Sequence, residues 1–446
     1  MKFVIIGGDA AGMSAASRAK RKNPDIDVTV LEMTMDVSYS ACGMPYNIAD
    51  PQRDMDELVV RRAETFINKN GINLMTGHTV KEINRVEKKV SGVTSDKTDF
   101  SFDYDKLLVA TGASPLIYDL SGFDLPGVMP LKSLEHGRRI KSFMELKRVK
   151  KAVIIGMGYI GLEMCEALDR RFIEVAMVKP RERLLPWLDD SLAAVVKKEL
   201  EENGVGFYAG HKVEKIESND KGLSVVCDDF ALEADMVIVA SGVKPNSEMA
   251  VDAGLDTSVS GSISVDRRLR TSDEDIYAAG DCADAFHVVT GEKCWIPLAL
   301  RANRAGWAVA DNICGTRTKL QGVAGTSVFR VFSLEVAKTG LNFKEAADAG
   351  FEPAQATVKT RSRAHGHPGS TQIHVNVVGD KPTGRLLGVQ MVGREGVAHR
   401  INAPAVALHN KMTVHDFSQT DLAYAPPFGP VWDPALTAAN QLLKKL

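Results

Sequence analysis

One cysteine of this sequence stands in a setting that suits redox chemistry. Cys42 follows polar residues and precedes Gly43 and Pro45. This pattern predicts a helix that starts directly after Cys42, with proline in its first turn. A thiol at such a helix start has a lowered pKa and more thiolate near neutral pH. We therefore interpret Cys42 as a reactive thiol, although free cysteines are commonly buried packing residues.

The remaining cysteines have no such neighbours, and we interpret them as packing residues. The nearest two cysteines are twelve positions apart, and no Cys-x-x-Cys pair occurs. This spacing argues against a zinc site and against a disulfide framework, so we expect no bound metal. The five packing cysteines are Cys165, Cys227, Cys282, Cys294 and Cys314.

Two segments predict dinucleotide-binding turns. Residues 3–22 and 152–168 each read as a buried strand, a glycine-rich turn and a helix. In such a turn one glycine makes the bend, the next admits a pyrophosphate, and the third lets the helix pack on the strand. The second turn is complete, whereas Asp9 replaces the middle glycine of the first. The predicted contacts are Gly7, Gly8, Ala11 and Gly12, and then Gly156, Gly158, Tyr159, Ile160 and Gly161.

The strands that follow these two turns end in opposite charges. Glu32 ends the first such strand, twenty residues after Gly12, where a carboxylate can bind a ribose. Lys179 ends the second, and Arg181 and Arg183 follow it. Basic groups there favour a 2′-phosphate over a 2′-hydroxyl, so the sequence favours NADPH over NADH. The alternative is a solvated Lys179 in a site that accepts either nucleotide.

Further strand ends carry residues suited to a bound cofactor. Thr111 and Gly112 end one strand, Gly242 follows another, and Asp281 follows a glycine after a third. A glycine lets the backbone close on a ligand, and a carboxylate accepts hydrogen bonds from sugar hydroxyls. We predict that these four residues bind cofactor.

Length and charge exclude several classes of protein. At roughly 150 residues per domain, 446 residues suggest about three domains. Lys and Arg number 55 against 57 for Asp and Glu, so there is no sign of the basic face of a nucleic-acid binder. No run approaches the ~18 apolar residues of a membrane span, and the N-terminus lacks the pattern of a signal peptide. We expect a cytoplasmic enzyme with neither nucleic-acid nor membrane partners.

Together, the two fingerprints, the small-residue turns and the late Gly-Asp pair resemble the two-dinucleotide-binding-domain flavoproteins, the glutathione reductase superfamily. The resemblance implies an α/β fold with two nested Rossmann-like domains, which bind FAD and NAD(P)H, and a C-terminal α+β dimerisation domain. In this family pattern Glu32 would hold the adenosine ribose of FAD and Asp281 its ribityl chain. The implied domains are FAD-binding (1–115 and 248–322), NAD(P)H-binding (116–247) and homodimerising (323–446).

One branch of this superfamily fits best. Asn47 stands where the disulfide reductases carry a second cysteine, so Cys42 would cycle alone. The run Cys-Gly-Met-Pro-Tyr that ends at Tyr46 resembles the coenzyme A-disulfide reductases, a branch that includes persulfide and polysulfide reductases. Tyr424, in Tyr-Ala-Pro-Pro, resembles the tyrosine by which the partner subunit assists the leaving thiolate, and it reads equally well as a packed aromatic. His367 stands where the branch has a Tyr-Tyr-Pro segment, and it would replace a phenol as proton donor or mark a different acceptor.

The resemblance implies that two electrons from NAD(P)H pass through FAD to a mixed disulfide between Cys42 and coenzyme A. Coenzyme A is therefore expected as substrate or bound ligand, with its disulfide, persulfide or polysulfide as the oxidant. Basic residues at the end of the first helix would bind its phosphates, or are simply solvated there. The expected groove residues are Arg18, Lys22, Ser38, Tyr39, Arg62 and Asn303.

Other functions stay open. An NAD(P)H oxidase or peroxidase would cycle Cys42 through a sulfenic acid. A reductase that serves a ferredoxin or rubredoxin needs no redox thiol. A non-catalytic flavin-bearing sensor would use Cys42 only to record oxidation.

Overall fold

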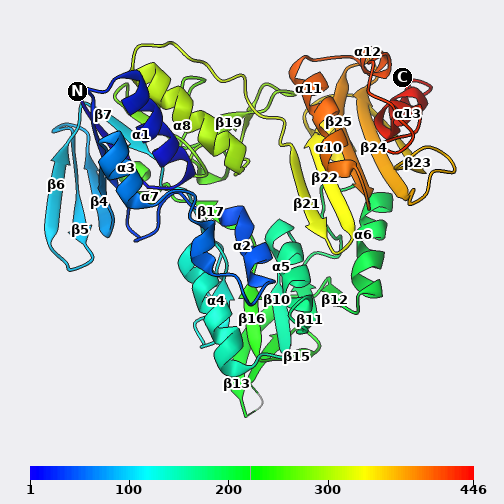
Figure 1. Cartoon of the computed structure of the whole chain (residues 1–446), viewed down its shortest axis with the longest axis horizontal. Helices are drawn as coiled ribbons and strands as arrows, with labels where there is room; N and C mark the ends of the chain where they lie inside the picture. Colours follow the sequence, from blue (N-terminus) through cyan, green and yellow to red (C-terminus); the bar gives the residue numbers. More distant parts are fainter. Residues whose placement is uncertain (221) are drawn as a thin grey trace.

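The computed structural model describes residues 1–220 and 222–446. Figure 1 shows three lobes, which follow the chain from the blue and yellow-green lobe through the cyan and green lobe to the yellow, orange and red lobe. The first lobe contains both an early and a later part of the chain, because the second lobe is inserted between them (Figure 1).

The first lobe is built on a parallel sheet with the strand order β18-β7-β1-β2-β3. At its centre β1 (Lys2–Ile6) pairs with β2 (Asp27–Leu31) and β7 (Lys106–Val109). The last four residues of β1 are buried, as is typical of a parallel strand covered on both faces. Helices α1 (Ala10–Lys22) and α8 (Ala299–Ile313) pack side by side (Figure 1). The lobe also contains β3 (Asn73–Met75), β4 (His78–Asn84), β5 (Lys89–Thr94), β6 (Asp99–Asp103), β18 (Ile276–Ala278), α3 (Ala63–Asn70) and α7 (Glu248–Asp252).

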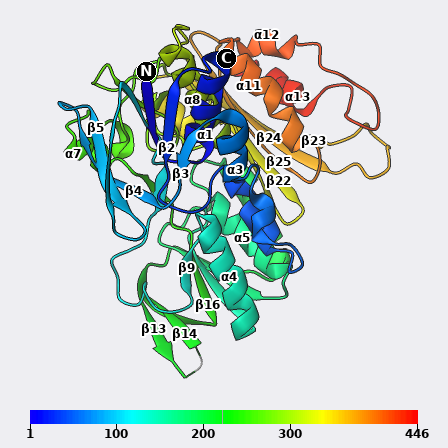
Figure 2. The same cartoon turned by 60° about the vertical axis from the view of Figure 1, so that its left-hand side comes forward.

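The second lobe repeats this plan. Its parallel sheet has the order β12-β11-β10-β16-β9, with β10 (Lys151–Ile155) between β11 (Glu174–Lys179) and β16 (Met236–Val239). Helices α4 (Leu134–Lys147) and α5 (Tyr159–Asp169) both belong to this lobe (Figure 2). Strands β10, β11, β12 and β16 occupy the places that β1, β2, β3 and β7 have in the first sheet. This agrees with the two strand–turn–helix segments predicted from the sequence. The remaining elements are β9 (Val128–Pro130), β12 (Gly206–Ala209), β13 (Val213–Asn219), β14 (Gly222–Cys227), β15 (Ala231–Ala234) and α6 (Asp190–Glu202).

The chain passes twice between these lobes, and the two crossings lie side by side. There β8 (Ala113–Pro115) pairs antiparallel with β17 (Val243–Pro245). The predicted domain boundaries, after residues 115 and 247, lie next to this pair.

The third lobe is an antiparallel sheet with the order β21-β22-β25-β24-β23 and helices packed against it. None of the helices in the described part of the chain is long and apolar enough to cross a bilayer. The strands are β21 (Ser327–Val331), β22 (Leu334–Gly340), β23 (Pro353–Arg361), β24 (Gln372–Asp380) and β25 (Leu386–Gly393). The helices are α9 (Phe343–Asp348), α10 (Val397–Arg400), α11 (Asn402–His409), α12 (Val414–Ser418) and α13 (Pro434–Leu442), and the short strands β19 (Ala285–Phe286) and β20 (Lys293–Cys294) precede the lobe.

The segment after Cys42 contributes its apolar side chains to the second lobe. It forms helix α2 (Met44–Ile48) and a 3-10 helix, η2 (Met55–Leu58). Figure 1 shows α2 above α4 and α5, and it packs against both helices. One apolar core joins Met44, Ile48, Met55 and Leu58 to Leu134, Ile140 and Met144 of α4. The segment therefore belongs to the first lobe by chain order but to the second by packing.

Candidate functional site

The first glycine turn joins β1 to α1 in the predicted way. Gly7 has φ +110°, and a Cβ atom there would collide with the backbone oxygen of Ala110. A Cβ atom on Gly12 would collide with the backbone oxygen of Gly7. Both positions thus require glycine, which brings the start of α1 against the end of β1.

Glu32 lies beside this turn, at the carboxyl end of β2. Its carboxylate accepts hydrogen bonds from the backbone N–H of Gly8 at 2.7 Å and from the N–H and hydroxyl of Thr34 at 2.8 and 2.7 Å. The side chain is buried. These donors orient the carboxylate where the sequence predicts a contact with the adenosine ribose.

Asp9 makes the first turn unusual. Its Oδ1 atom is buried without a hydrogen-bond partner among the described residues. Burial raises the pKa of Asp9 to about 6, and the nearby charges of Glu32 and Asp281 act in the same direction. The raised pKa brings the protonated form of Asp9 closer to neutral pH, and that form could donate a hydrogen bond to a pyrophosphate oxygen of FAD.

The second turn leaves space for a phosphate. Gly156 has φ +113°, and Gly161 packs closely on its backbone. A Cβ atom on Gly158 would meet nothing within 4 Å, so the start of α5 is open. Tyr159 turns its ring toward Phe329 of β21, with ring centroids 5.0 Å apart, and Ile160 is half-buried.

Lys179 does not lie as the sequence predicts. It is buried, and its ammonium donates to the backbone oxygen of Arg183 at 2.6 Å. Burial lowers the pKa of Lys179, and Arg181 adds to this effect. Lys179 is therefore neither a solvated side chain nor a cation at the surface. Arg181 is exposed and has no ion-pair partner within the described residues.

The predicted small-residue turns meet where the chain crosses between lobes. The hydroxyl of Thr111 donates to the backbone oxygen of Asn246 at 2.6 Å, and the Asn246 amide donates to the backbone oxygen of Thr111 at 2.8 Å. Gly112 and Gly242 both have positive φ, +71° and +117°. These contacts hold the two crossings together beside both nucleotide turns.

Asp281 and Lys132 form an ion pair close to Cys42. The Lys132 ammonium lies 3.1 Å from Asp281 Oδ2, and the indole of Trp295 donates to the Asp281 backbone oxygen at 2.8 Å. The charges of both partners act on the Cys42 thiol. The structure thus brings the carboxylate predicted for the ribityl chain near the predicted redox cysteine.

Cys42 lies at a helix start, as predicted. It is in a 3-10 turn, η1 (Ala41–Gly43), and α2 follows directly with Pro45 in its first turn. All six cysteines are free, and Cys42 is the exposed one among them. Ser40, two residues before Cys42, donates its N–H to the backbone oxygen of Leu58 at 2.8 Å, so η2 lies beside the thiol loop.

The expected low pKa of Cys42 is wrong for this structure. Desolvation by the surrounding protein raises the pKa of the thiol, and the charge of Glu163 raises it further, while Lys132 acts in the opposite direction. Helix α2 has only five residues, and its N-terminal dipole is outweighed by burial and by this carboxylate.

Sequence reasoning missed the carboxylate that faces the redox loop. Glu163 is the fifth residue of α5, and its Oε1 accepts a hydrogen bond from the Tyr46 hydroxyl at 2.7 Å. Burial raises the pKa of Glu163, whereas the hydrogen bond from Tyr46 lowers it. The available signal was its position two residues after Gly161, at the start of the nucleotide-binding helix.

The residues expected to bind coenzyme A divide into two groups. Arg18 donates twice to the carboxylate of Asp311, at 2.7 and 2.9 Å, and Lys22 lies 3.0 Å from the same group. These two cations therefore share one carboxylate of α8, a contact that the sequence did not predict. Arg62 is exposed and has no ion-pair partner among the described residues.

Of the other residues expected to bind coenzyme A, Asn303 lies on α8, and Ser38 and Tyr39 lie in the loop before Cys42. Asn303 of α8 is exposed and accepts a hydrogen bond from the hydroxyl of Ser14 at 2.6 Å. Ser38 has a left-handed backbone with φ +50°, and its backbone oxygen accepts from the N–H of Val60 at 2.9 Å. Tyr39 is half-buried and bridges to Val59. The loop that carries Ser38 and Tyr39 thus pairs with the strand-like residues after η2.

Tyr424 and His367 lie on two neighbouring segments of the third lobe. The N–H of Ala364 donates to the backbone oxygen of Pro426 at 3.1 Å, which joins the two segments that carry them. Tyr424 is 48% exposed, and the ring of His367 contacts the backbone oxygen of Pro368. Figure 1 places the parts of the third lobe that carry these residues, between β23 and β24 and between α12 and α13, away from α2. The exposed apolar side chains of Phe428, Val431 and Trp432 follow Tyr424.

Comparison with known proteins agrees with this arrangement. The family described as pyridine nucleotide-disulphide oxidoreductase matches residues 1–306, and the dimerisation domain of the same enzymes matches residues 326–435. A curated relative from Pyrococcus furiosus, an NAD(P)H sulfur oxidoreductase (CoA-dependent), is 40% identical over 442 residues, 99% of each chain. An NADH oxidase from Methanocaldococcus jannaschii is 34% identical over 100% of this chain and 99% of its own.

A solved structure extends the comparison to three dimensions. The NAD-dependent persulfide reductase from A. fulgidus superposes with a TM-score of 0.96 and 38% identity. The match covers 100% of this chain and 83% of that one. The predicted fold, with two nested nucleotide-binding domains and a C-terminal dimerisation domain, is confirmed.

Proposed function

Because the chain belongs to the pyridine nucleotide-disulphide oxidoreductase family, we propose that it is an FAD-dependent NAD(P)H oxidoreductase that reduces coenzyme A-linked disulfide or persulfide sulfur through Cys42. One observation carries the proposal. Cys42 is the single exposed cysteine of the chain, at a helix start between the two nucleotide-binding lobes, and it is free. A lone thiol must take its disulfide partner from the substrate.

The chain's own residues fit the two nucleotides. Gly7, Gly12 and Glu32 would hold FAD, and Gly158 leaves the phosphate position of NAD(P)H open. When bound, FAD accepts hydride from NAD(P)H and passes two electrons on to sulfur. Arg181, rather than Lys179, is the cation that is free to meet a 2′-phosphate.

The thiol chemistry balances with one cysteine. The Cys42 thiolate attacks the disulfide of oxidised coenzyme A, forms a Cys42–coenzyme A mixed disulfide and releases one coenzyme A thiolate. Two electrons then cleave the mixed disulfide, which returns the Cys42 thiolate and releases a second coenzyme A thiolate. Each thiolate released to solvent takes up one proton. A persulfide substrate would release sulfide by the same exchange.

The proton donor would come from a second copy of the chain. The third-lobe segments that carry His367 and Tyr424, between β23 and β24 and between α12 and α13, lie away from α2 in Figure 1, and the segment after Tyr424 exposes large apolar side chains. Residues 326–435 match a dimerisation domain. In a homodimer formed through residues 323–446, Tyr424 of one subunit would protonate the leaving thiolate at the other subunit's Cys42, with His367 beside it.

The substitution Cys42→Ser tests this function. The variant should retain FAD that NADPH reduces under anaerobic conditions, and it should lose turnover of coenzyme A disulfide. Cys314→Ser, which changes a half-buried cysteine elsewhere, serves as the matched control and should keep full turnover. Retained disulfide turnover by Cys42→Ser would refute the proposal.

An NADH oxidase is the second candidate, because the relative from Methanocaldococcus jannaschii carries that name. In that reaction Cys42 would alternate between thiolate and sulfenic acid. Faster turnover with oxygen or peroxide than with coenzyme A disulfide would favour it.

A further inference from the structure

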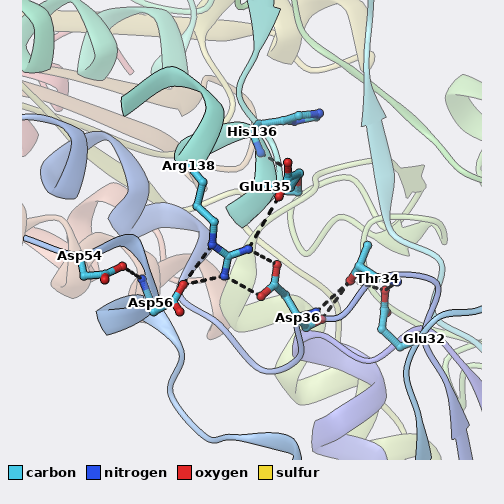
Figure 3. Close-up of polar contacts among 9 residues, drawn as sticks. Glu32, Thr34, Asp36, Asp54, Asp56, Glu135, His136 and Arg138 are labelled. Atoms are coloured by element: carbon cyan, nitrogen blue, oxygen red, sulfur yellow. Dashed lines mark hydrogen bonds and ion pairs between the residues drawn. The ribbon is translucent and has the colours of Figure 1, made fainter. Parts of the chain in front are cut away.

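Two cationic side chains of helix α4, in the second lobe, bind the segment that carries Cys42. One of them, Arg138, contacts Asp36, before Cys42 in the chain, and Asp56, after it (Figure 3). We propose that Arg138, supported by Lys141, is a positioning residue that fixes both the Glu32 loop and the Cys42 segment on the NAD(P)H-binding lobe. The proposal rests on the proposed function only in taking Cys42 as the redox thiol.

The guanidinium of Arg138 hydrogen-bonds to two carboxylates, and the carboxylate of Glu135 on the same helix lies 3.9 Å from it (Figure 3). Nη1 and Nη2 each donate to Asp36 at 2.8 Å, which makes a bidentate pair. Nε and Nη2 also donate to Asp56 Oδ1, at 3.0 and 2.6 Å. Asp36 is only 17% exposed, so this pair is shielded from solvent far better than an ordinary surface ion pair. These hydrogen bonds raise the pKa of Arg138 further above its usual range.

A chain of hydrogen bonds leads from Arg138 to the FAD side. The backbone N–H of Asp36 donates to the hydroxyl of Thr34 at 3.3 Å, and that hydroxyl donates to Glu32 at 2.7 Å (Figure 3). The loop that orients the Glu32 carboxylate is therefore tied to α4. Losing the contact with Asp36 should loosen the site of the adenosine ribose.

A second set of contacts leads from Arg138 to Cys42. Asp56 lies in η2, whose last residue, Leu58, accepts the N–H of Ser40. Met55 of η2 packs directly on Gly137, where an added Cβ atom would lie 2.8 Å from its terminal methyl group. η2 therefore connects α4 to the residues just before the thiol.

Lys141, one turn along α4, binds the end of the helix that follows Cys42. Its ammonium is buried and donates to the backbone oxygen of Asp50 at 2.9 Å, to Asn47 Oδ1 at 3.1 Å and to the backbone oxygen of Arg53. A cation at these carbonyl oxygens satisfies groups that the end of α2 leaves unpaired. Arg138 and Lys141 thus hold the segment between Asp36 and Asp56 at several points.

These contacts fix the Cys42 segment on the lobe that binds the nicotinamide nucleotide. The thiol and the hydride donor must meet FAD from fixed positions, and small misplacements slow such reactions strongly. If Arg138 had only a structural role, substitutions at its contacts would lower overall stability but would not change FAD binding and Cys42 reactivity separately.

The test compares Arg138→Gln, Arg138→Lys and the control Arg139→Gln in the holoenzyme. Arg139 is an exposed neighbour on the same helix, so its substitution makes the same charge change without breaking the contacts. The first measurement is the alkylation rate of Cys42 by iodoacetamide at saturating FAD, from pH 6 to 10, with the site read by mass spectrometry. The second is the dissociation constant of FAD from fluorescence.

We expect Arg138→Gln to raise the limiting alkylation rate at least threefold and to weaken FAD binding at least fivefold. Arg138→Lys should give intermediate values, because one ammonium cannot bind both carboxylates bidentately. Values for Arg138→Gln that equal those of Arg139→Gln would overturn the proposal.

The single contacts provide a second test if Arg138→Gln fails to fold. Asp36→Asn should weaken FAD binding with little change in Cys42 alkylation, whereas Asp56→Asn should do the reverse. Equal effects of both substitutions on both readouts would overturn the proposal. Alkylation reads the position of the thiol and not turnover, so a wild-type enzyme without disulfide reductase activity would refute the proposed function alone.

Discussion

Replacing Glu163 by glutamine should lower the pKa of Cys42. The Glu163 carboxylate is the strongest nearby charge that raises the pKa of this thiol, and it lies on α5 with the Tyr46 hydroxyl 2.7 Å from its Oε1. Glutamine keeps the shape and can still accept the hydrogen bond from Tyr46, so the substitution removes the charge and little else.

The magnitude follows from the loss of one carboxylate. A like charge near an ionisable group shifts a pKa by about one unit or more when both are shielded from water. Cys42 is exposed, so solvent screening weakens the effect of the lost charge. At pH 7, where the thiol is mostly protonated, a fall in its pKa raises the thiolate fraction, by about tenfold for each unit.

The assay is the pH dependence of Cys42 alkylation by iodoacetamide, because the thiolate is the reacting species. Glu64→Gln, an exposed carboxylate in the first turn of α3, is the control and should leave the profile unchanged. Tyr46→Phe should also lower the pKa of Cys42, since the lost hydrogen bond favours protonated Glu163. An unchanged or higher pKa of Cys42 in Glu163→Gln would refute this reasoning.

Two further predictions concern the nucleotide turns. Asp9→Asn should stabilise the apoprotein at pH 8 by up to about 3 kcal/mol, because a pKa of about 6 against 3.8 makes the ionised carboxylate unfavourable in the fold. The stability linked to Asp9 is fully present below pH 3.8 and is lost as the pH rises through about 6, so urea unfolding of the two proteins should converge below pH 4. Arg181→Gln should lower kcat/KM for NADPH about tenfold relative to NADH, since hydrogen bonds to charged groups contribute about 1.5 kcal/mol or more. Lys179→Gln should instead lower the melting temperature, and a Lys179→Gln variant that loses NADPH preference while Arg181→Gln keeps it would reverse the assignment.

Local patterns predicted much of the fold and site from the sequence. The glycines at 7, 12, 156 and 161 are required by contacts within one strand, turn and helix, and Glu32 ends the next strand at a fixed spacing. These features depend on few neighbouring residues, so they can be read from the sequence. The helix after Cys42 is local in the same way, because Pro45 sets its first turn.

What the sequence could not predict arises where distant segments meet. Asp311 pairs with both Arg18 and Lys22 from a helix nearly 300 residues away. The pKa of Cys42 is raised by protein burial and by Glu163 of the other lobe, against the direction that its helix start suggests. Such electrostatic effects depend on how the lobes pack, and the local pattern carries no information about that packing.

Lys179 shows a related limit. A basic residue at the end of a strand indicates a positive charge there, but the sequence does not show which way the side chain points. Its long stem lets the ammonium turn inward to a backbone oxygen, which leaves Arg181 at the surface in its place.

The central claim is that Cys42 alone carries the substrate-derived disulfide. The most direct measurement is the intact mass of the enzyme after exposure to coenzyme A disulfide, followed by peptide mapping and by addition of NADPH. The account predicts one coenzyme A per chain, attached at Cys42 and released by NADPH. A full-length enzyme that turns over the disulfide without any such adduct, or with an adduct on another cysteine, would contradict it.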